Sequence, residues 1–335
     1  MPDLSSTNQK NILQQNKQKN SFFTARPLLV ALFFFLPILL PGFIGWLNAL
    51  LAVPIFLLLQ TATDEQKAAV EIRNGLLMAG LGSLLIGRFS MFLFTLIMLP
   101  VGYSLHHSAV QQKNPAQAGI AGIITLSIAW LFFWTGYSVL SGTPHPYTGL
   151  LTSLDAFLEQ IIIVYRTNGE LPVDTLYRLE LLITAMRELL PKILPGLLAG
   201  TVVLTVTLNM IISRVLLRRL APEKVFWPPY KEWQLPDKTI WFLIFSFVLL
   251  LINSGQGKTV GLSLVCVAGL LYFLQGVAVV MHTLNRWNLP RAFRLFAYVF
   301  LGLQRYGVLL VIIIGIADTW ANFRKLDHTE KDTTE

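Results

Sequence analysis

Long stretches without charge constrain this chain more than any other feature of its sequence. Residues 27–63 contain no Lys, Arg, Asp or Glu, and residues 114–154 are likewise uncharged. A helix needs about 20 largely apolar residues to cross the ~30 Å hydrocarbon core of a bilayer. Only 13% of all residues are charged, about half the share of a soluble domain. We therefore expect an all-α integral membrane protein built as a polytopic helical bundle.

Breaks in the apolar sequence predict about eight or nine transmembrane helices. Pro37, Pro41 and Gly42 favour a turn that divides residues 27–63 into two short spans. The other expected spans are 66–87, 89–105, 117–137, 193–213, 239–255, 259–283 and 291–320. The predicted organisation is then a disordered cytoplasmic tail at 1–26, membrane helices over 27–144 and 193–320, and a polar tail at 321–335 that frays after Asn322.

The longest expected connection, residues 145–192, has the pattern of two amphipathic helices. Apolar residues recur at helical spacing on either side of Thr167-Asn168-Gly169, while polar residues fill the other faces. Acidic residues outnumber basic ones there, which suits the extracytoplasmic side. The insertion could cap the bundle, cover an outward-facing cavity as a lid, or dock a periplasmic partner.

Lys and Arg in short loops predict the orientation, because cytoplasmic loops are enriched in both. Basic residues precede the first span, and others crowd the connections 214–238 and 286–294. We expect a bacterial inner-membrane protein with a cytoplasmic N-terminus, first marked by Lys10, Lys17, Lys19 and Arg26. Nine spans leave Arg324 and Lys325 on the outer side, against this rule.

Aromatic and basic residues lie together in the connection 214–238. Rings beside cations suit the lipid headgroup layer, so we expect headgroup or partner contacts from Trp227, Trp233, Arg218 and Arg219. The net charge of +8 follows from this cytoplasmic bias, and no nucleic-acid partner is expected.

Polar side chains inside apolar spans are costly and mark candidate binding residues. These are Gln275, His282, Arg305 and Asp318. Gln275 and His282 are seven residues apart on one helical face, as residues lining one cavity would be. Arg305 and Asp318 are too far apart to pair along one helix. Asn48 and Asn209 are expected to bond across helices, and His106 and His107 to contact headgroups.

Sequence motifs of catalysis are absent. The chain has no HExxH, P-loop or GxSxG pattern. Its single cysteine, Cys266, cannot form a disulfide framework, and His145 is followed by proline without a neighbouring carboxylate. No cofactor or metal is therefore expected, and an enzymatic role has no positive support.

Three motifs of the C-terminal half resemble the YybS-like family of predicted bacterial membrane proteins, the domain of unknown function 2232. They are Trp233-Gln234-Leu235-Pro236-Asp237 before Ile240-Trp241, the run Tyr272 to Val279, and Gly315 to Trp320 followed by Asn322-Phe323-Arg324-Lys325. The resemblance covers most of residues 25–325, but residues 145–190 match no pattern of that family.

The resemblance implies two analogies. The family is distantly similar to the membrane-embedded substrate-binding components of vitamin transporters, which implies binding of a small solute. It is also similar to small membrane proteins of the rod-shape machinery, which implies scaffolding. Our leading hypothesis is a multi-span protein that binds or moves a small solute without its own ATPase. The alternative is a membrane scaffold that binds a protein partner, and a third reading is a lipid-modifying enzyme.

Overall fold

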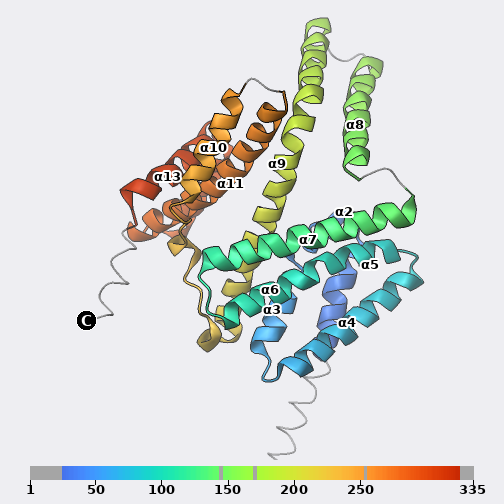
Figure 1. Cartoon of the computed structure of the whole chain (residues 1–335), viewed down its shortest axis with the longest axis vertical. Coiled ribbons are helices and arrows are strands. Elements are labelled where there is room, and N and C mark those ends of the chain that lie inside the picture. Colours follow the sequence, from blue (N-terminus) through green and yellow to red (C-terminus); the bar gives the residue numbers. More distant parts are fainter. Residues whose placement is uncertain (1–24, 143–145, 169–171, 253–254, 325–335) are drawn as a thin grey trace, which may run out of the picture. The chain divides into compact units, whose positions relative to one another are not determined.

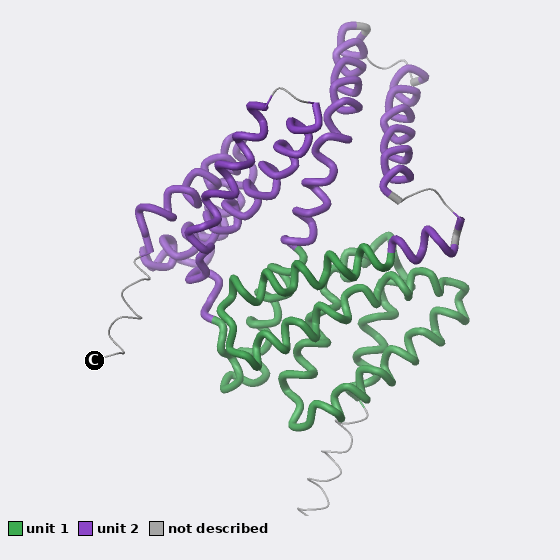
Figure 2. Tube along the Cα trace, in the orientation of Figure 1, with its two compact units in different colours: residues 1–133, 205–227 green, residues 134–204, 228–335 purple. Residues whose placement is uncertain are grey.

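Every regular element that the computed structural model describes is a helix (Figure 1), and the described residues are 25–142, 146–168, 172–252 and 255–324. This confirms the all-α expectation. The chain divides into two compact units (Figure 2): unit 1 contains residues 1–133 and 205–227, and unit 2 contains residues 134–204 and 228–335. Two long helices, α7 (Pro115–Ser141) and α9 (Val173–Leu220), supply residues to both.

Unit 1 begins with the helix Ala25–Leu39 and the segment Pro41–Leu50, which are bent by 105° at their junction. The break lies within the expected Pro37–Gly42 turn, because Pro41 cannot continue the preceding helix. The elements that follow are α2 (Pro41–Ile44), η1 (Gly45–Leu50), α3 (Ala52–Thr61), α4 (Glu65–Leu85), α5 (Phe89–Thr95), η2 (Leu96–Met98), α6 (Leu99–Val110) and, after α9, η3 (Pro222–Lys224).

Local signals in unit 1 fix where its helices start and turn. The Asp64 carboxylate accepts a hydrogen bond of 2.9 Å from the Gln66 amide and caps α4. Gly87 adopts φ 69°, which turns the chain from α4 into α5. The next residue, Arg88, donates to the carbonyl oxygens of Ile38 and Leu39 at 2.9 and 3.0 Å, and so satisfies the end of the first helix.

Unit 2 contains the end of α7 and most of α9, together with α8 (Pro146–Asn168), η4 (Tyr230–Glu232), α10 (Thr239–Leu251), α11 (Gly255–Arg286), α12 (Arg291–Leu303) and α13 (Gly307–Ala321). Leu243, Ala268 and Tyr272 form a buried cluster joined by Ile312 and Ile316 of α13. Small residues bring the helices close: a Cβ on Gly196 of α9 would lie 2.6 Å from the Ser263 Cα of α11. The glycines therefore serve packing within the chain.

Within the described residues, five helices are long and apolar enough to cross a membrane, or up to seven if each bent pair counts as one span. The five are Phe89–Val110, Pro115–Leu140, Tyr147–Thr167, Asp174–Leu220 and Gly255–Arg286. The second bent pair is α12 with α13, at 107°. The expected eight or nine spans are not confirmed. The helix α4 carries several charges, and α10 has 13 residues, about 20 Å, which is shorter than a ~30 Å bilayer core.

The helix α9 differs most from the sequence-based boundaries. We expected an amphipathic helix that ends near 192 and a separate span from 193, but α9 runs through both over 48 residues, with Pro191 and Pro195 inside it. The expected break after Asn168 does coincide with the end of α8. Other predictions lie outside the described residues: Lys10, Lys17 and Lys19 in the N-terminal tail, His145, and the tail from residue 325.

Candidate functional site

Unit 2 contains a buried ion pair at the end of α13. The Arg324 guanidinium lies 2.7 Å from Asp318 Oδ2, and the two side chains are 0% and 1% exposed. Gln275 of α11 donates to the same carboxylate oxygen at 3.1 Å. We call Gln275, Asp318 and Arg324 the Asp318 cluster. It joins the two helices by polar contacts where their apolar packing ends.

The backbone after α13 explains how Arg324 reaches Asp318. Asn322 adopts the left-handed conformation with φ 40°, and its amide donates to the Asp318 carbonyl at 3.1 Å. Asparagine is among the few residues that tolerate this conformation, which ends helices. The chain therefore reverses after one turn and brings Arg324 back over the acid six residues before it.

The Asp318 cluster also makes hydrogen bonds to the backbone of segment 230–235, which precedes α10. Arg324 Nη1 donates to the carbonyl oxygens of Lys231 and Trp233 at 3.0 and 2.7 Å. The Leu235 amide donates to Gln275 Oε1 at 3.4 Å. Arg324 thus neutralises one carboxylate and satisfies two backbone acceptors, so it fixes the entry to α10 against the end of α13.

Two aromatic residues of this segment, Tyr230 and Trp233, make further hydrogen bonds. The Tyr230 hydroxyl donates to the Leu274 carbonyl at 2.6 Å, and Trp233 Nε1 donates to the Pro228 carbonyl at 2.8 Å. Their rings meet edge to face, with centroids 5.5 Å apart. Burial raises the pKa of Tyr230 far above its ordinary value of 10.0, although Arg324 opposes that rise. Tyr230 is therefore a neutral hydrogen-bond donor here.

The structure brings together only two of the four predicted binding residues. Gln275 and Asp318 bond to each other, whereas His282 is not part of the cluster and its Nδ1 has no hydrogen-bond partner among the described residues. Arg305 is exposed at the break between α12 and α13, 5.6 Å from the centre of the Tyr306 ring. A cavity lined jointly by these side chains is therefore not supported.

Arg324 is the residue that sequence reasoning missed. We expected the chain to fray after Asn322, and this is wrong for Arg324, which is 5% exposed. The available signal was the pattern Asp318-Thr319-Trp320-Ala321-Asn322-Phe323-Arg324: an acid in an apolar helix, a helix-ending asparagine and then a base. An intramembrane acid needs a partner, and a chain reversal can supply one from beyond the helix.

The predicted aromatic and basic contacts divide into two groups. Trp227 is 3% exposed and belongs to the core of unit 1, where it stacks on Phe56 at 5.6 Å and donates to the Lys113 carbonyl at 3.2 Å. This burial contradicts a headgroup role for Trp227. Trp233 is half-buried, whereas Arg218 and Arg219 are exposed in the last turn of α9, where a headgroup role for the two arginines stays a prediction.

Unit 1 contains a second set of polar contacts, centred on His106, that the sequence did not predict. His106 is 8% exposed, and its ring nitrogens lie 2.8 Å from Gln60 Oε1 and 3.0 Å from Glu65 Oε1. Lys224 donates to the Gln60 and Ala62 carbonyls at 2.9 and 3.3 Å. His106 therefore links α3 to α4 instead of facing headgroups. The expected interhelical bond of Asn209 is confirmed, since its amide donates to the Ala49 carbonyl.

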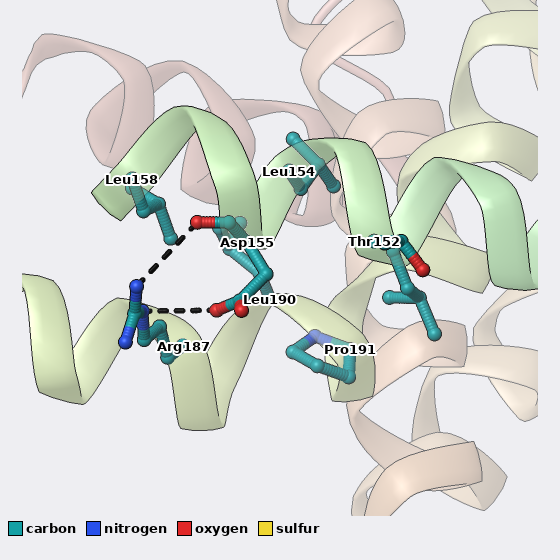
Figure 3. Close-up of a pocket in the computed structure, with 8 residues that line it drawn as sticks. Thr152, Leu154, Asp155, Leu158, Arg187, Leu190 and Pro191 are labelled. Carbon is teal, nitrogen blue, oxygen red and sulfur yellow. Dashed lines mark hydrogen bonds and ion pairs between the residues drawn. The ribbon is translucent and has the colours of Figure 1, made fainter. Parts of the chain in front are cut away.

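A pocket of about 330 Å³ lies between α8 and the N-terminal part of α9 (Figure 3). Its wall is mainly apolar, with Leu154 and Leu158 from one helix and Leu190 from the other. The Arg187 guanidinium lies 2.9 Å from Asp155 and 3.6 Å from Glu159. Because two carboxylates already face this arginine, the pocket offers no excess positive charge for an anionic ligand.

The helical units and their apolar spans are those of a multi-pass membrane protein. The family model described as predicted membrane protein, domain of unknown function 2232, matches residues 28–319. The chain belongs to this family, as the sequence motifs indicated. No curated protein and no solved structure matches it.

Proposed function

We propose that this chain is a membrane-anchored interaction protein whose α8–α9 arm binds a protein partner beside the bilayer. The arm consists of α8 and residues 173–191 of α9. The observation that carries the proposal is the exposure of large apolar side chains on one face of both helices of the arm: Phe157 is 59% exposed, Leu182 63% and Met186 45%. Contiguous exposed apolar surface of this kind marks interaction sites.

The length of α9 supports an arm outside the hydrocarbon core. Its 48 residues extend about 72 Å, whereas a bilayer core takes up about 20 residues. Residues 193–213 are uncharged, while six charged residues lie within 173–192. The uncharged part is the better membrane segment. Although α8 alone is apolar enough for a span, it is tied to the charged part of α9 by Arg187–Asp155 at 2.9 Å and Arg166–Glu180 at 2.7 Å.

Contacts between α9 and α11 also indicate that the N-terminal part of α9 extends past the other helices of unit 2. The Ser263 hydroxyl donates to the Lys192 carbonyl at 2.9 Å, and a Cβ on Gly200 would lie 3.3 Å from Leu270. The two helices are therefore parallel. Since α11 starts at Gly255, only about two turns before Ser263, most of residues 173–184 extend past its first turn. The α10–α11 pair cannot cover the apolar side chains there.

A photo-reactive amino acid tests this function in native membranes. We expect p-benzoylphenylalanine at Leu182 to give a discrete protein adduct, because this exposed apolar side chain would lie in the interface. The matched control is the same probe at Thr184, which is also exposed but lies about 160° away around α9. Equal labelling at the two positions, or none at Leu182, would contradict the proposal.

Solute binding remains a second candidate because of the pocket between α8 and α9. A volume of about 330 Å³ is within the range of small-molecule sites, and its leucines suit an uncharged apolar ligand. Thermal-shift screening of the purified protein tests this. A ligand that stabilises the wild type but not Leu158→Trp, which fills the pocket, supports binding there; no stabilising ligand argues against it.

The positive-inside pattern supports a bacterial inner membrane with the 214–238 connection in the cytoplasm. Arg324 binds the backbone of Lys231 and Trp233, so the end of α13 lies on the same side as that connection. This contact supports a cytoplasmic position for Arg324, which the positive-inside rule favours. The α8–α9 arm then belongs on the extracytoplasmic side.

A further inference from the structure

The α8–α9 arm has two unlike faces. One face carries the ion pairs Arg166–Glu180 and Arg187–Asp155, at 2.7 and 2.9 Å. With 100° of rotation per residue, the opposite face carries only uncharged side chains at its centre. Its apolar members are Leu150 at 38% exposure, Phe157 at 59%, Val164 at 53%, Leu182 at 63%, Met186 at 45% and Leu189 at 48%. We call these six residues the apolar face.

The spacing of the apolar face is that of a helix-packing seam. On α8, the residues Leu150, Phe157 and Val164 repeat every seven positions. On α9, Leu182, Met186 and Leu189 alternate steps of four and three, and Leu179 and Ile193 continue this alternation in both directions. Heptad spacing keeps one stripe turned toward a neighbouring helix. The stripe on α9 is separate from Ile183 and Leu190, which face α8.

We propose that the apolar face docks against the same face of a second copy of this chain, so that two arms form a four-helix bundle. This rests on the proposed function and names the partner. An antiparallel helix pair with an apolar face two helices wide is half of such a bundle. A twofold contact places each surface against its own copy, and an uncharged face does so without like-charge repulsion.

Two further features favour a copy of the chain over a different partner. The ion pairs Arg166–Glu180 and Arg187–Asp155 lie on the other side of the arm, and the six residues of the apolar face carry no charge that would select a foreign protein. The arm also continues without a break into the uncharged part of α9. Two copies in one membrane therefore carry their apolar faces at the same height above the bilayer, and no further adjustment is needed for the seams to align.

Site-directed cross-linking of the full chain in native membranes tests whether the apolar face docks against a second copy. In a Cys266→Ser background, Met186→Cys is treated with a bismaleimide that reaches about 10 Å, the axis spacing of packed helices. The matched control is Thr184→Cys, exposed on the other side of the same turn. We expect roughly tenfold more covalent dimer from Met186→Cys than from Thr184→Cys, since only the first faces the seam. Equal yields would overturn the proposal.

The mass of the protein in nanodiscs gives a second readout. Leu182→Lys with Met186→Lys should convert the dimer to a monomer, and Thr184→Lys should leave it dimeric. A wild-type monomer overturns the proposal. If p-benzoylphenylalanine at position 182 then labels a different polypeptide, self-association of the arm is contradicted, but the proposal that the arm binds a protein partner stands. If Leu182 labels nothing, both proposals fail.

Discussion

Arg324 and Asp318 form a fully buried ion pair at 2.7 Å although Arg324 follows the end of the helix that carries Asp318. The pair does not stand alone, since the same guanidinium also satisfies the carbonyl oxygens of Lys231 and Trp233. Removing one partner of a buried pair leaves an uncompensated charge, which costs far more than the pair contributes relative to apolar packing.

We predict that Arg324→Ala lowers the free energy of unfolding by about 3–5 kcal/mol, because it strands the buried Asp318 carboxylate. The measurement is denaturant unfolding in detergent. Arg305→Ala is the matched control: Arg305 is exposed, and this variant should stay near the wild type. The double variant Asp318→Asn with Arg324→Ala should recover part of the loss. A wild-type stability for Arg324→Ala would contradict the role given to the pair.

The crossing of α11 and α13 gives a steric prediction. A Cβ on Gly315 would overlap the Tyr272 carbonyl, whereas Gly302 has no atom within 4 Å of such a Cβ. Gly315→Ala should therefore cost about 1–3 kcal/mol through forced separation of the helices, while Gly302→Ala should cost little. Thermal unfolding of both variants decides this, and similar midpoints would show that the crossing adapts without strain.

The raised pKa of Tyr230 predicts a difference at alkaline pH. The folded protein retains the phenolic proton above pH 10.0, where an unfolded tyrosine loses it. The unfolded state then binds fewer protons, so stability falls as pH rises above the unfolded pKa. Tyr230→Phe should show a shallower fall than wild type in this range, measured by unfolding at a series of pH values. Parallel curves would mean that Tyr230 does not titrate differently in the two states.

The Arg324 contacts also predict membrane sidedness. In a Cys266→Ser background, Gln234→Cys and Phe323→Cys should react with an impermeant maleimide from the same side, because both flank the Asp318 cluster. Gln256→Cys, at the start of α11, should react from the opposite side. Labelling of Gln234→Cys and Phe323→Cys from opposite sides would refute this arrangement.

The sequence predicted the helical class and the turn near Pro41, and it singled out Gln275 and Asp318 as polar residues within apolar helices, because each follows from local composition. A ligand-binding role for these two residues stays a prediction. It could not predict that Trp227 is buried while Trp233 is only half-buried, since the two lie in one short aromatic segment and differ only in what packs on them. The continuity of α9 through Pro191 and Pro195 was likewise hidden, because proline is normally read as a helix end. Arg324 was missed since its partners depend on a chain reversal.

The contacts of Arg324 have a consequence for how the protein is made. Its partners Lys231 and Trp233 precede it by 93 and 91 residues, and a chain is synthesised from its N-terminus. These carbonyl groups therefore lack the Arg324 donor until α10, α11, α12 and α13 have left the ribosome. A chain interrupted before Arg324 lacks the guanidinium that pairs with Asp318 and binds these two carbonyl groups. The polar contacts that complete unit 2 are thus formed only after synthesis of the chain has passed residue 324.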